Sequence, residues 1–192
     1  LLSYQDIKRP DLLKKLLIAL ALQIGNEVSY TELASTIGMD KKTVDRYIGL
    51  LEQSFIIYRL GSFSQNLRNE LKRANKVYFW DTGIRNALIN NFNPLDKRID
   101  SGALWENYVI TERRKFMLNR RANFDHYFWR TTSQQEIDLI EVENSQISAF
   151  EIKWNSKKQL KIPASFCKGY TPTTVAIINP ENYLQLMLPR ES

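Results

Sequence analysis

The chain has 192 residues and a formal net charge of +6 at pH 7, with 43% hydrophobic and 25% charged residues. This composition is ordinary for a globular protein and excludes a disordered or fibrous one. A single cysteine, Cys167, and a single histidine, His126, exclude a disulfide framework, a cysteine-rich zinc site and most histidine-based metal sites. Catalysis by this chain must therefore use carboxylates and lysine. The basic excess favours a polyanionic partner such as nucleic acid, but a merely soluble surface gives the same excess.

The sequence carries none of the patterns of a membrane or nucleotide-binding chain. No stretch reaches the roughly 18 apolar residues of a membrane span, and no signal-peptide pattern or GxxxxGK[ST] phosphate loop occurs. We therefore expect a cytoplasmic chain without an ATP site of its own. Because the first residue is Leu1 rather than Met, we expect a fragment of a longer polypeptide.

The first half of the chain predicts helices followed by a β-hairpin. In chain order these are a helix over residues 12–24, a short helix over 31–37, a helix after Asp40, and strands over 55–60 and 76–80. Gly38 is expected to end the short helix, and Asp40 is a suitable N-cap for the next one. This order is typical of a winged helix-turn-helix domain.

The helix after Asp40 is the candidate DNA-binding element, because the second helix of such a pair enters the major groove. Its leading edge carries basic and hydroxyl side chains suited to phosphate contact: Lys41, Lys42, Thr43 and Arg46. The wing, the polar loop of the expected hairpin, adds Arg68, Lys72, Arg73 and Lys76. The alternative is a module that packs against protein, with these charges solvated, because helix-turn-helix folds do not all bind DNA.

The second half of the chain predicts the order α-β-β-β-α-β. Its elements are a helix over residues 101–116, strands over 126–130, 136–142 and 147–154, a short helix over 164–170 and a strand over 174–178. The polar run from Asn91 to Asp96 marks the domain boundary. We therefore expect two domains, 1–94 and 95–192, in the α/β (α+β) class.

Three ionisable residues interrupt the apolar strands of the second half: Asp138, Glu151 and Lys153. Alternate side chains of a strand share a face, so Glu151 and Lys153 point one way and Trp154 the other. If Asp138 faces the same side, the two carboxylates suit Mg²⁺ or Mn²⁺, and the lysine can orient water or stabilise charge on a phosphate. The pattern predicts metal-assisted phosphodiester hydrolysis. The alternative is a cross-strand salt bridge on a solvated sheet.

The motifs "WEN", "EIDLI" and "FEIKW", in this order of elements, resemble the PD-(D/E)xK nuclease superfamily, although Ile137 stands where its proline would be. The resemblance implies a restriction-endonuclease-like fold, with Asp138, Glu151 and the backbone carbonyl of Ile152 as metal ligands. It implies that Lys153 positions or activates water and that Glu106 is an outer or additional ligand. Such a fold can also serve as a DNA-binding or docking platform without cutting.

The whole chain, with "KVYFWDTGIRNAL", "GALWENYVITE" and "AIINPENY" in order, resembles the C-terminal region of a prokaryotic AAA+ type ATPase family. The resemblance implies that an ATP-hydrolysing core precedes this fragment, and that DNA and this core are its partners. The chain would then be a DNA-associated, Mg²⁺-dependent nuclease-like module. The alternative is a non-catalytic module that binds DNA or protein and recruits or regulates the core.

The remaining candidates have two interpretations each. Phe128, Trp129 and Trp154 are expected to pack in the core, although aromatic rings also stack on bases. His126 is expected to be structural. A further run of cations either holds a phosphate backbone or is a solvated charge run: Lys157, Lys158 and Lys161.

Overall fold

The computed structural model describes residues 9–64, 75–157 and 162–188, which form two compact units. The first unit holds the described residues up to Arg59 and residues 75–97, and the second holds residues 60–64 and the described residues from Arg98 onward. Helices and strands are mixed along the chain, so the expected α+β class is confirmed. The division at residue 94 stays a prediction, and it differs from these units at residues 60–64 and 95–97.

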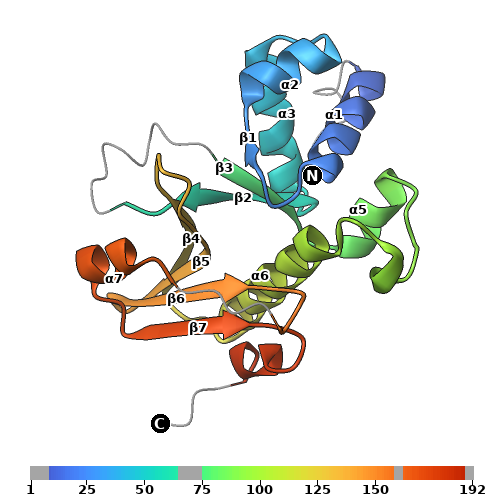
Figure 1. Ribbon diagram of the computed structural model, residues 1–192. Coiled ribbons are helices and arrows are strands. Elements are labelled where there is room, and N and C mark those ends of the chain that lie inside the picture. The colour runs from blue at the N-terminus through green and yellow to red at the C-terminus, as the bar shows by residue number, and fades with distance from the viewer. Residues whose placement is uncertain (1–8, 65–74, 158–161, 189–192) are drawn as a thin grey trace. The chain divides into compact units, whose positions relative to one another are not determined.

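The described part of the first unit contains four α-helices, a short 3-10 helix and the first strands (Figure 1). Its elements are α1 (Pro10–Leu22), β1 (Glu27–Val28), α2 (Tyr30–Ile37), α3 (Lys41–Gln53), the beginning of β2 (Ile57–Ser62), β3 (Asn75–Phe79), α5 (Thr82–Leu88) and η2 (Leu95–Lys97). β1 pairs antiparallel with β3, which is followed in strand order by β2. The predicted helices and strands of this half are therefore present.

Local capping explains where α2 and α3 begin and end. Gly38 ends α2 in the left-handed conformation, with φ of 76°, which glycine adopts without steric cost. Asp40 then begins α3, because its side-chain Oδ1 accepts a hydrogen bond of 2.9 Å from the backbone N–H of Thr43. Both predicted caps are confirmed.

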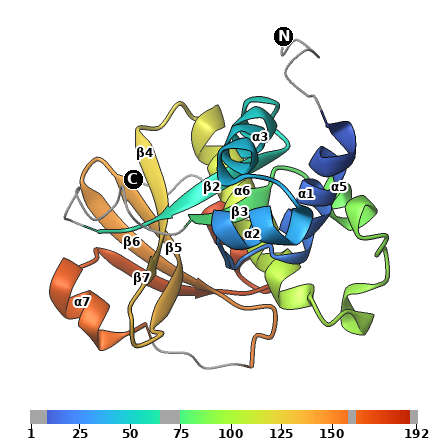
Figure 2. The same cartoon turned by 90° about the horizontal axis from the view of Figure 1, so that it is seen from above.

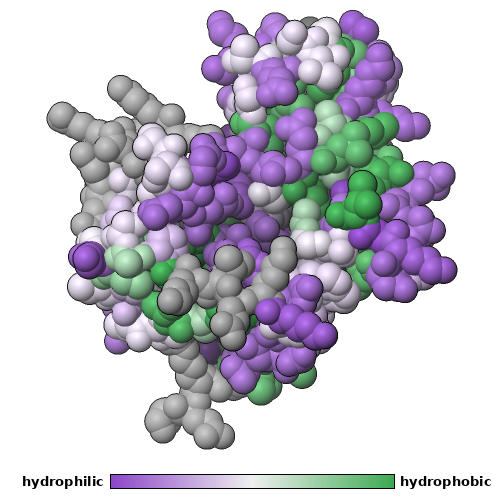
Figure 3. Space-filling model, in the orientation of Figure 1, coloured by the Kyte–Doolittle hydropathy of each residue, from purple (hydrophilic) through white to green (hydrophobic). Residues whose placement is uncertain are grey.

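The apolar faces of these helices form the core of the first unit, which includes Leu16, Leu20, Val44 and Ile48. Large apolar side chains also remain exposed in this unit: Leu22, Phe55, Ile84, Phe92 and Leu95. Figure 3 shows an apolar area over α1 and α5, two helices that contact each other. Exposed apolar area of this kind is typical of interaction surfaces when it is contiguous.

The second unit is a sheet with helices (Figures 1 and 2). Its elements are the end of β2, α6 (Ser101–Asn119), β4 (Phe124–Arg130), β5 (Glu136–Glu143), β6 (Gln146–Ile152), α7 (Ala164–Tyr170), β7 (Thr174–Ile178) and η3 (Tyr183–Leu186). The strand order is β2-β4-β5-β6-β7. β2 runs parallel to β4 and β6 runs parallel to β7, whereas β4, β5 and β6 are antiparallel neighbours. The predicted α-β-β-β-α-β order is confirmed.

A tight turn joins β5 to β6, with Asn144 and Ser145 at φ of 50° and 67°. Two consecutive residues with positive φ are typical of the turn that matches the twist of a hairpin. β6 ends at Ile152, two residues before the predicted end, and the chain bends at Trp154. The predicted alternation of faces therefore does not continue to Trp154.

One core cluster of the second unit joins α7 to the sheet. It consists of Phe63, Trp129, Ile137, Ile140, Ala149 and Phe166. Phe128 is buried as well, so the expectation that Phe128 and Trp129 pack in the core is confirmed. No helix in the described part of the chain is both long and apolar enough to cross a membrane.

Candidate functional site

Asp138 lies at the point where β5 and β6 stop pairing. Leu139 is opposite Phe150, so Asp138 and Glu151 are the next residues along the two strands. The Asp138 side chain is buried, and its Oδ2 accepts a hydrogen bond of 2.7 Å from the backbone N–H of Ile152. The backbone of β6 therefore fixes the position of this carboxylate.

Lys153 connects the two acids. Its Nζ lies 3.0 Å from Oδ2 of Asp138 and 2.7 Å from Oε1 of Glu151. Burial alone would lower the pKa of Lys153, but the charge of Asp138 and the hydrogen bond and charge of Glu151 outweigh it and raise the pKa. The ammonium group is therefore charged and offsets part of the repulsion between the two carboxylates.

Glu151 has one carboxylate oxygen that the protein leaves unsatisfied. Within the described part of the chain, its Oε2 is buried and has no hydrogen-bond partner. Burial, together with the charge of Asp138, raises the pKa of Glu151, and Lys153 opposes this shift only in part. An unsatisfied buried polar atom is costly, so this oxygen is a candidate for contact with a proton, a cation or a ligand.

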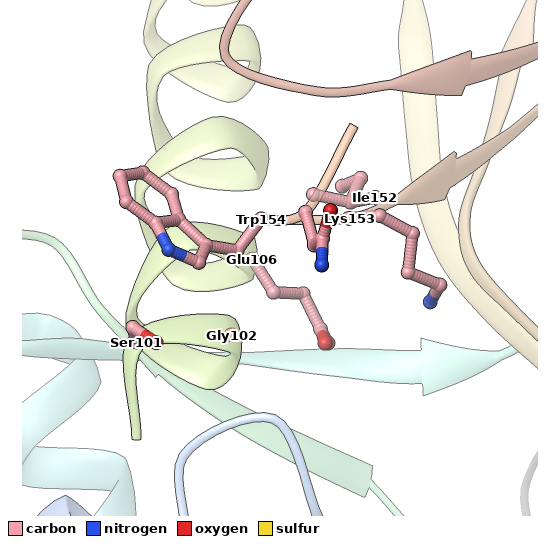
Figure 4. A pocket seen from close by; sticks show the side chains of 7 residues that line it. Ser101, Gly102, Glu106, Ile152, Lys153 and Trp154 are labelled. Carbon is pink, nitrogen blue, oxygen red and sulfur yellow. The ribbon is translucent and has the colours of Figure 1, made fainter. Parts of the chain in front are cut away.

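A pocket of about 390 Å³ opens beside this cluster (Figure 4). Seven residues from the start of α6 and the end of β6 line it: Ser101, Gly102, Glu106, Ile152, Lys153, Trp154 and Asn155. Glu106 therefore lies in the same pocket as Lys153. The pocket brings both side chains to a cavity of the size that binds small ligands.

The donor set fits a hard cation only in part. Asp138, Glu151 and the carbonyl of Ile152 offer the oxygen ligands that Mg²⁺ and Mn²⁺ prefer, and the unsatisfied Oε2 of Glu151 is available to one. In the described part of the chain, however, no group of three or more His, Cys, Asp or Glu side chains can hold a metal ion. Glu106 therefore does not complete a three-carboxylate cluster. It is a pocket residue, and its role as a direct ligand is not supported.

The predicted DNA-binding residues lie at the start of α3, in the first unit. Lys41, Lys42 and Arg46 are exposed, and the guanidinium of Arg46 lies 5.1 Å from the ring centroid of Tyr47. The Thr43 hydroxyl is already engaged, because it bonds Oδ2 of the capping Asp40 at 2.6 Å. Three cations are therefore presented to solvent, while Thr43 mainly stabilises the helix start.

The other predicted phosphate contacts have different outcomes. Lys76 is buried in β3, so its prediction as an exposed wing cation is wrong. Lys157 is exposed. The remaining cations lie outside the described residues: Arg68, Lys72, Arg73, Lys158 and Lys161.

A buried ionic network in the second unit escaped the sequence analysis. Arg113 of α6 donates two hydrogen bonds to Glu141 of β5, at 2.7 and 2.6 Å, and another to the carbonyl of Leu186. Nε2 of His126 lies 2.9 Å from Oε2 of the same glutamate. The available signal was an acid in an apolar strand, Glu141, and an arginine in a helix, Arg113, but nothing in the sequence connects the two. This network supports the structural role expected for His126.

Comparison with known proteins gives domain matches without a characterised activity. Residues 1–95 match the family model "Domain of unknown function (DUF8612)", and residues 101–185 match "Domain of unknown function (DUF4143)". The second is a domain often found at the C-terminus of AAA-ATPase-type proteins. No solved structure matches the chain significantly.

Two curated relatives are similar over much of the chain. They are the uncharacterized protein Rv2008c of Mycobacterium tuberculosis and the uncharacterized protein Mb2031c of Mycobacterium bovis, each 28% identical over 134 residues. The aligned part makes up 69% of this chain but 30% of each relative. The chain therefore spans less than a third of the length of these relatives.

Proposed function

We propose that the second unit is a nuclease-like module that uses Mg²⁺ or Mn²⁺ to hydrolyse phosphodiester bonds in DNA. One observation carries the proposal: the Lys153 ammonium lies within 3.0 Å of both Asp138 and Glu151, beside an open pocket. A pair of neighbouring carboxylates with a charged lysine suits metal-assisted phosphoryl chemistry.

The roles follow from the chemistry of each group. Asp138, Glu151 and the carbonyl of Ile152 would hold the metal ion, which supplies charge neutralisation and lowers the pKa of bound water. Lys153 would donate hydrogen bonds to a phosphate oxygen or to the attacking water. Glu106, from the pocket wall, would accept a hydrogen bond from a water there. The backbone N–H of Ile152 keeps Asp138 in position throughout.

The larger setting of this module is a protein of the AAA-ATPase type. The match of residues 101–185 supports this, because that domain often stands at the C-terminus of such proteins. The relatives are also long enough for an additional domain, since the aligned part is 30% of each. We therefore propose that this module acts together with an ATPase core.

The first test is Mn²⁺ binding by calorimetry, with the native chain and an Asp138→Ala, Glu151→Ala double variant. We expect binding by the native chain and none by the double variant, while Asp125→Ala, which removes an exposed acid of β4, binds as the native chain does. Cleavage of labelled DNA with Mg²⁺ follows, and Lys153→Ala should abolish it. Equal Mn²⁺ binding by the native and double-variant chains, or full cleavage by Lys153→Ala, would contradict the proposal.

The second candidate function is a non-catalytic module that recruits DNA or protein to the core. Exposed Lys41, Lys42 and Arg46 on α3 favour DNA, whereas the apolar area over α1 and α5 favours protein (Figure 3). Each phosphate contact removed should reduce the slope of log affinity against log salt by about 1. Lys42→Ala tests this in a DNA titration, with Lys14→Ala, an exposed lysine of α1 that is not a predicted phosphate contact, as the control. An unchanged slope would leave protein as the partner.

A further inference from the structure

Trp154 occupies a position that the strand pattern did not predict. Alternation along β6 would turn its side chain away from Lys153. Because β6 ends at Ile152 and the chain bends at Trp154, both side chains line the same pocket (Figure 4). In this view the indole extends toward α6, and the Lys153 chain extends in another direction. An aromatic surface and a cation are thus presented to one cavity.

Other aromatic rings hold the Trp154 indole in place. Its ring centroid lies 5.6 Å from that of Trp105 in an edge-on arrangement, and Trp105 lies 5.2 Å from Tyr183. Trp105 is buried, with 8% of its surface exposed, whereas Trp154 is only half-buried. Edge-on aromatic pairs are favourable, so the buried ring supports the outer one and fixes its orientation.

We propose that Trp154 is the stacking surface for an unpaired nucleobase, and that the adjoining phosphate lies toward Lys153. The site would then take single-stranded rather than duplex DNA, an inference that rests on the nuclease-like function proposed above. Stacking on an aromatic ring is how proteins hold unstacked bases without regard to their identity. The pocket also carries polar groups for the base edge and sugar, from Ser101 and Asn155. A purely acidic peptide would engage Lys153 but leave the indole without a partner.

The test measures binding of the full chain to a short fluorescent oligothymidylate by anisotropy, without divalent cations so that no cleavage occurs. A second oligonucleotide of equal length carries abasic sites in place of the bases. We expect Trp154→Ala to weaken binding of the oligothymidylate about 5- to 150-fold, the range measured for loss of one stacked base. Trp154→Phe should restore most of the affinity. The abasic strand should bind weakly and respond little to Trp154→Ala.

Controls separate stacking from a general loss of structure. Phe92→Ala removes an aromatic side chain that is 68% exposed in the first unit, and it should bind the oligothymidylate as the native chain does. Circular dichroism of each variant verifies folding. The inference is overturned if the native chain does not bind the oligothymidylate, or if Trp154→Ala weakens both strands equally or neither.

The outcome also distinguishes this inference from the proposed function. If the native chain, Trp154→Phe and Trp154→Ala all cleave single-stranded and duplex DNA equally, Trp154 has no stacking role, but the proposed nuclease function stands. If binding depends on the bases and on Trp154 but no DNA is cleaved in Mn²⁺, the nuclease function is wrong, and the pocket is a binding site for single-stranded DNA.

Discussion

Lys153 opposes the protonation of Glu151. Its hydrogen bond and charge lower the pKa of Glu151, against burial and the charge of Asp138, which raise it more. The two carboxylates therefore remain together only because one ammonium is shared between them. This arrangement makes Glu151 sensitive to any change at Lys153.

We predict that Lys153→Met raises the pKa of Glu151 further above its ordinary value. The substitution keeps most of the aliphatic chain but removes the charge that opposes burial and Asp138. The measurement is an NMR titration of the glutamate side-chain carboxyl carbons. A pKa of Glu151 that stays unchanged or falls would contradict this account of the cluster.

We predict that Arg113→Met lowers the free energy of unfolding by about 3–5 kcal/mol, because it leaves Glu141 buried without its cation. The measurement is urea unfolding at neutral pH. Lys115→Met is the matched control on the same helix, since its pair with Glu112 is only partly buried and should contribute about 0–1 kcal/mol. Similar losses in the two variants would mean that burial does not decide the contribution of these pairs.

The same network predicts how stability depends on pH. Burial would raise the pKa of Glu141, but the hydrogen bonds and charges of Arg113 and His126 lower it from 4.5 to about 2. A carboxyl with a lowered folded-state pKa contributes stability above its unfolded pKa, and this is lost as the pH falls from 4.5 toward 2. Burial lowers the pKa of His126, despite Glu141, so protonation of the unfolded chain also reduces stability below pH 6.5.

We therefore predict that stability falls continuously from about pH 6.5 downward, the ordinary range of histidine titration. Urea unfolding across this range measures it. Glu141→Gln should be less stable at neutral pH and should lose the steep part of the dependence below pH 4.5. If Glu141→Gln keeps the native acid dependence, other carboxylates are responsible for it.

At the scale of elements, local patterns predicted most of the structure. The short helix α7 and the strand β7 begin and end at the predicted residues, because apolar spacing and turn residues bound them. β6 ends two residues early, although Lys153 and Trp154 fit a strand pattern. Its pairing with β5 ends at Phe150 and its pairing with β7 ends at Ile152. Where a strand stops pairing with its neighbours cannot be read from the residue pattern of that strand alone.

The meeting of the candidate site residues could be predicted from the sequence. Asp138, Glu151 and Lys153 meet because an antiparallel hairpin places residues of the same face opposite each other, and a short turn sets the register. Trp154 in the pocket and the Arg113–Glu141 pair were not predictable, because they depend on a strand end and on the packing of α6. Neither contact can be predicted from the sequence alone.

We predict that Asp40→Ala lowers the free energy of unfolding of the first unit by about 0.5–2 kcal/mol, the usual cost of losing an N-cap. The side chain of Asp40 accepts hydrogen bonds from both the backbone N–H and the hydroxyl of Thr43 at the start of α3. Asp40→Asn should retain most of the stability because asparagine caps equally well. Thermal unfolding followed by circular dichroism compares them, and equal losses in both variants would mean that charge rather than capping matters.

At the scale of the whole chain, the two units share the strand β2. Its end pairs in parallel with β4, at Gly61 with Tyr127 and Ser62 with Phe128. The backbone N–H of Phe63 then donates to the carbonyl of Phe128 at 2.6 Å. A parallel pair between segments about 65 residues apart leaves no local pattern in the sequence. A cut at the predicted boundary would therefore remove a strand from the second unit.

We predict that Phe63→Ala destabilises the second unit by about 3–5 kcal/mol, the usual cost of deleting a buried phenyl ring. Phe63 is 7% exposed, and its ring lies 5.1 Å from that of Tyr170 and 6.4 Å from that of Phe166. Hydrogen exchange measures the effect amide by amide: protection should fall in β4 and β5. The exposed Phe92→Ala serves as control and should change protection little.

The helices and strands that lose hydrogen-exchange protection in Phe63→Ala decide which domain boundary is correct. Residues 60–64 precede the other described residues of the second unit by more than 30 positions, yet the structure groups them with it. If Phe63→Ala loosens β4 and β5 while α1, α2 and α3 keep their protection, this segment belongs energetically to the second unit. A fragment starting at residue 95 would then lack part of the fold that holds Asp138 and Glu151. If the loss falls on the three helices instead, the boundary predicted at residue 94 stands, and the fragment should bind Mn²⁺ as well as the full chain does.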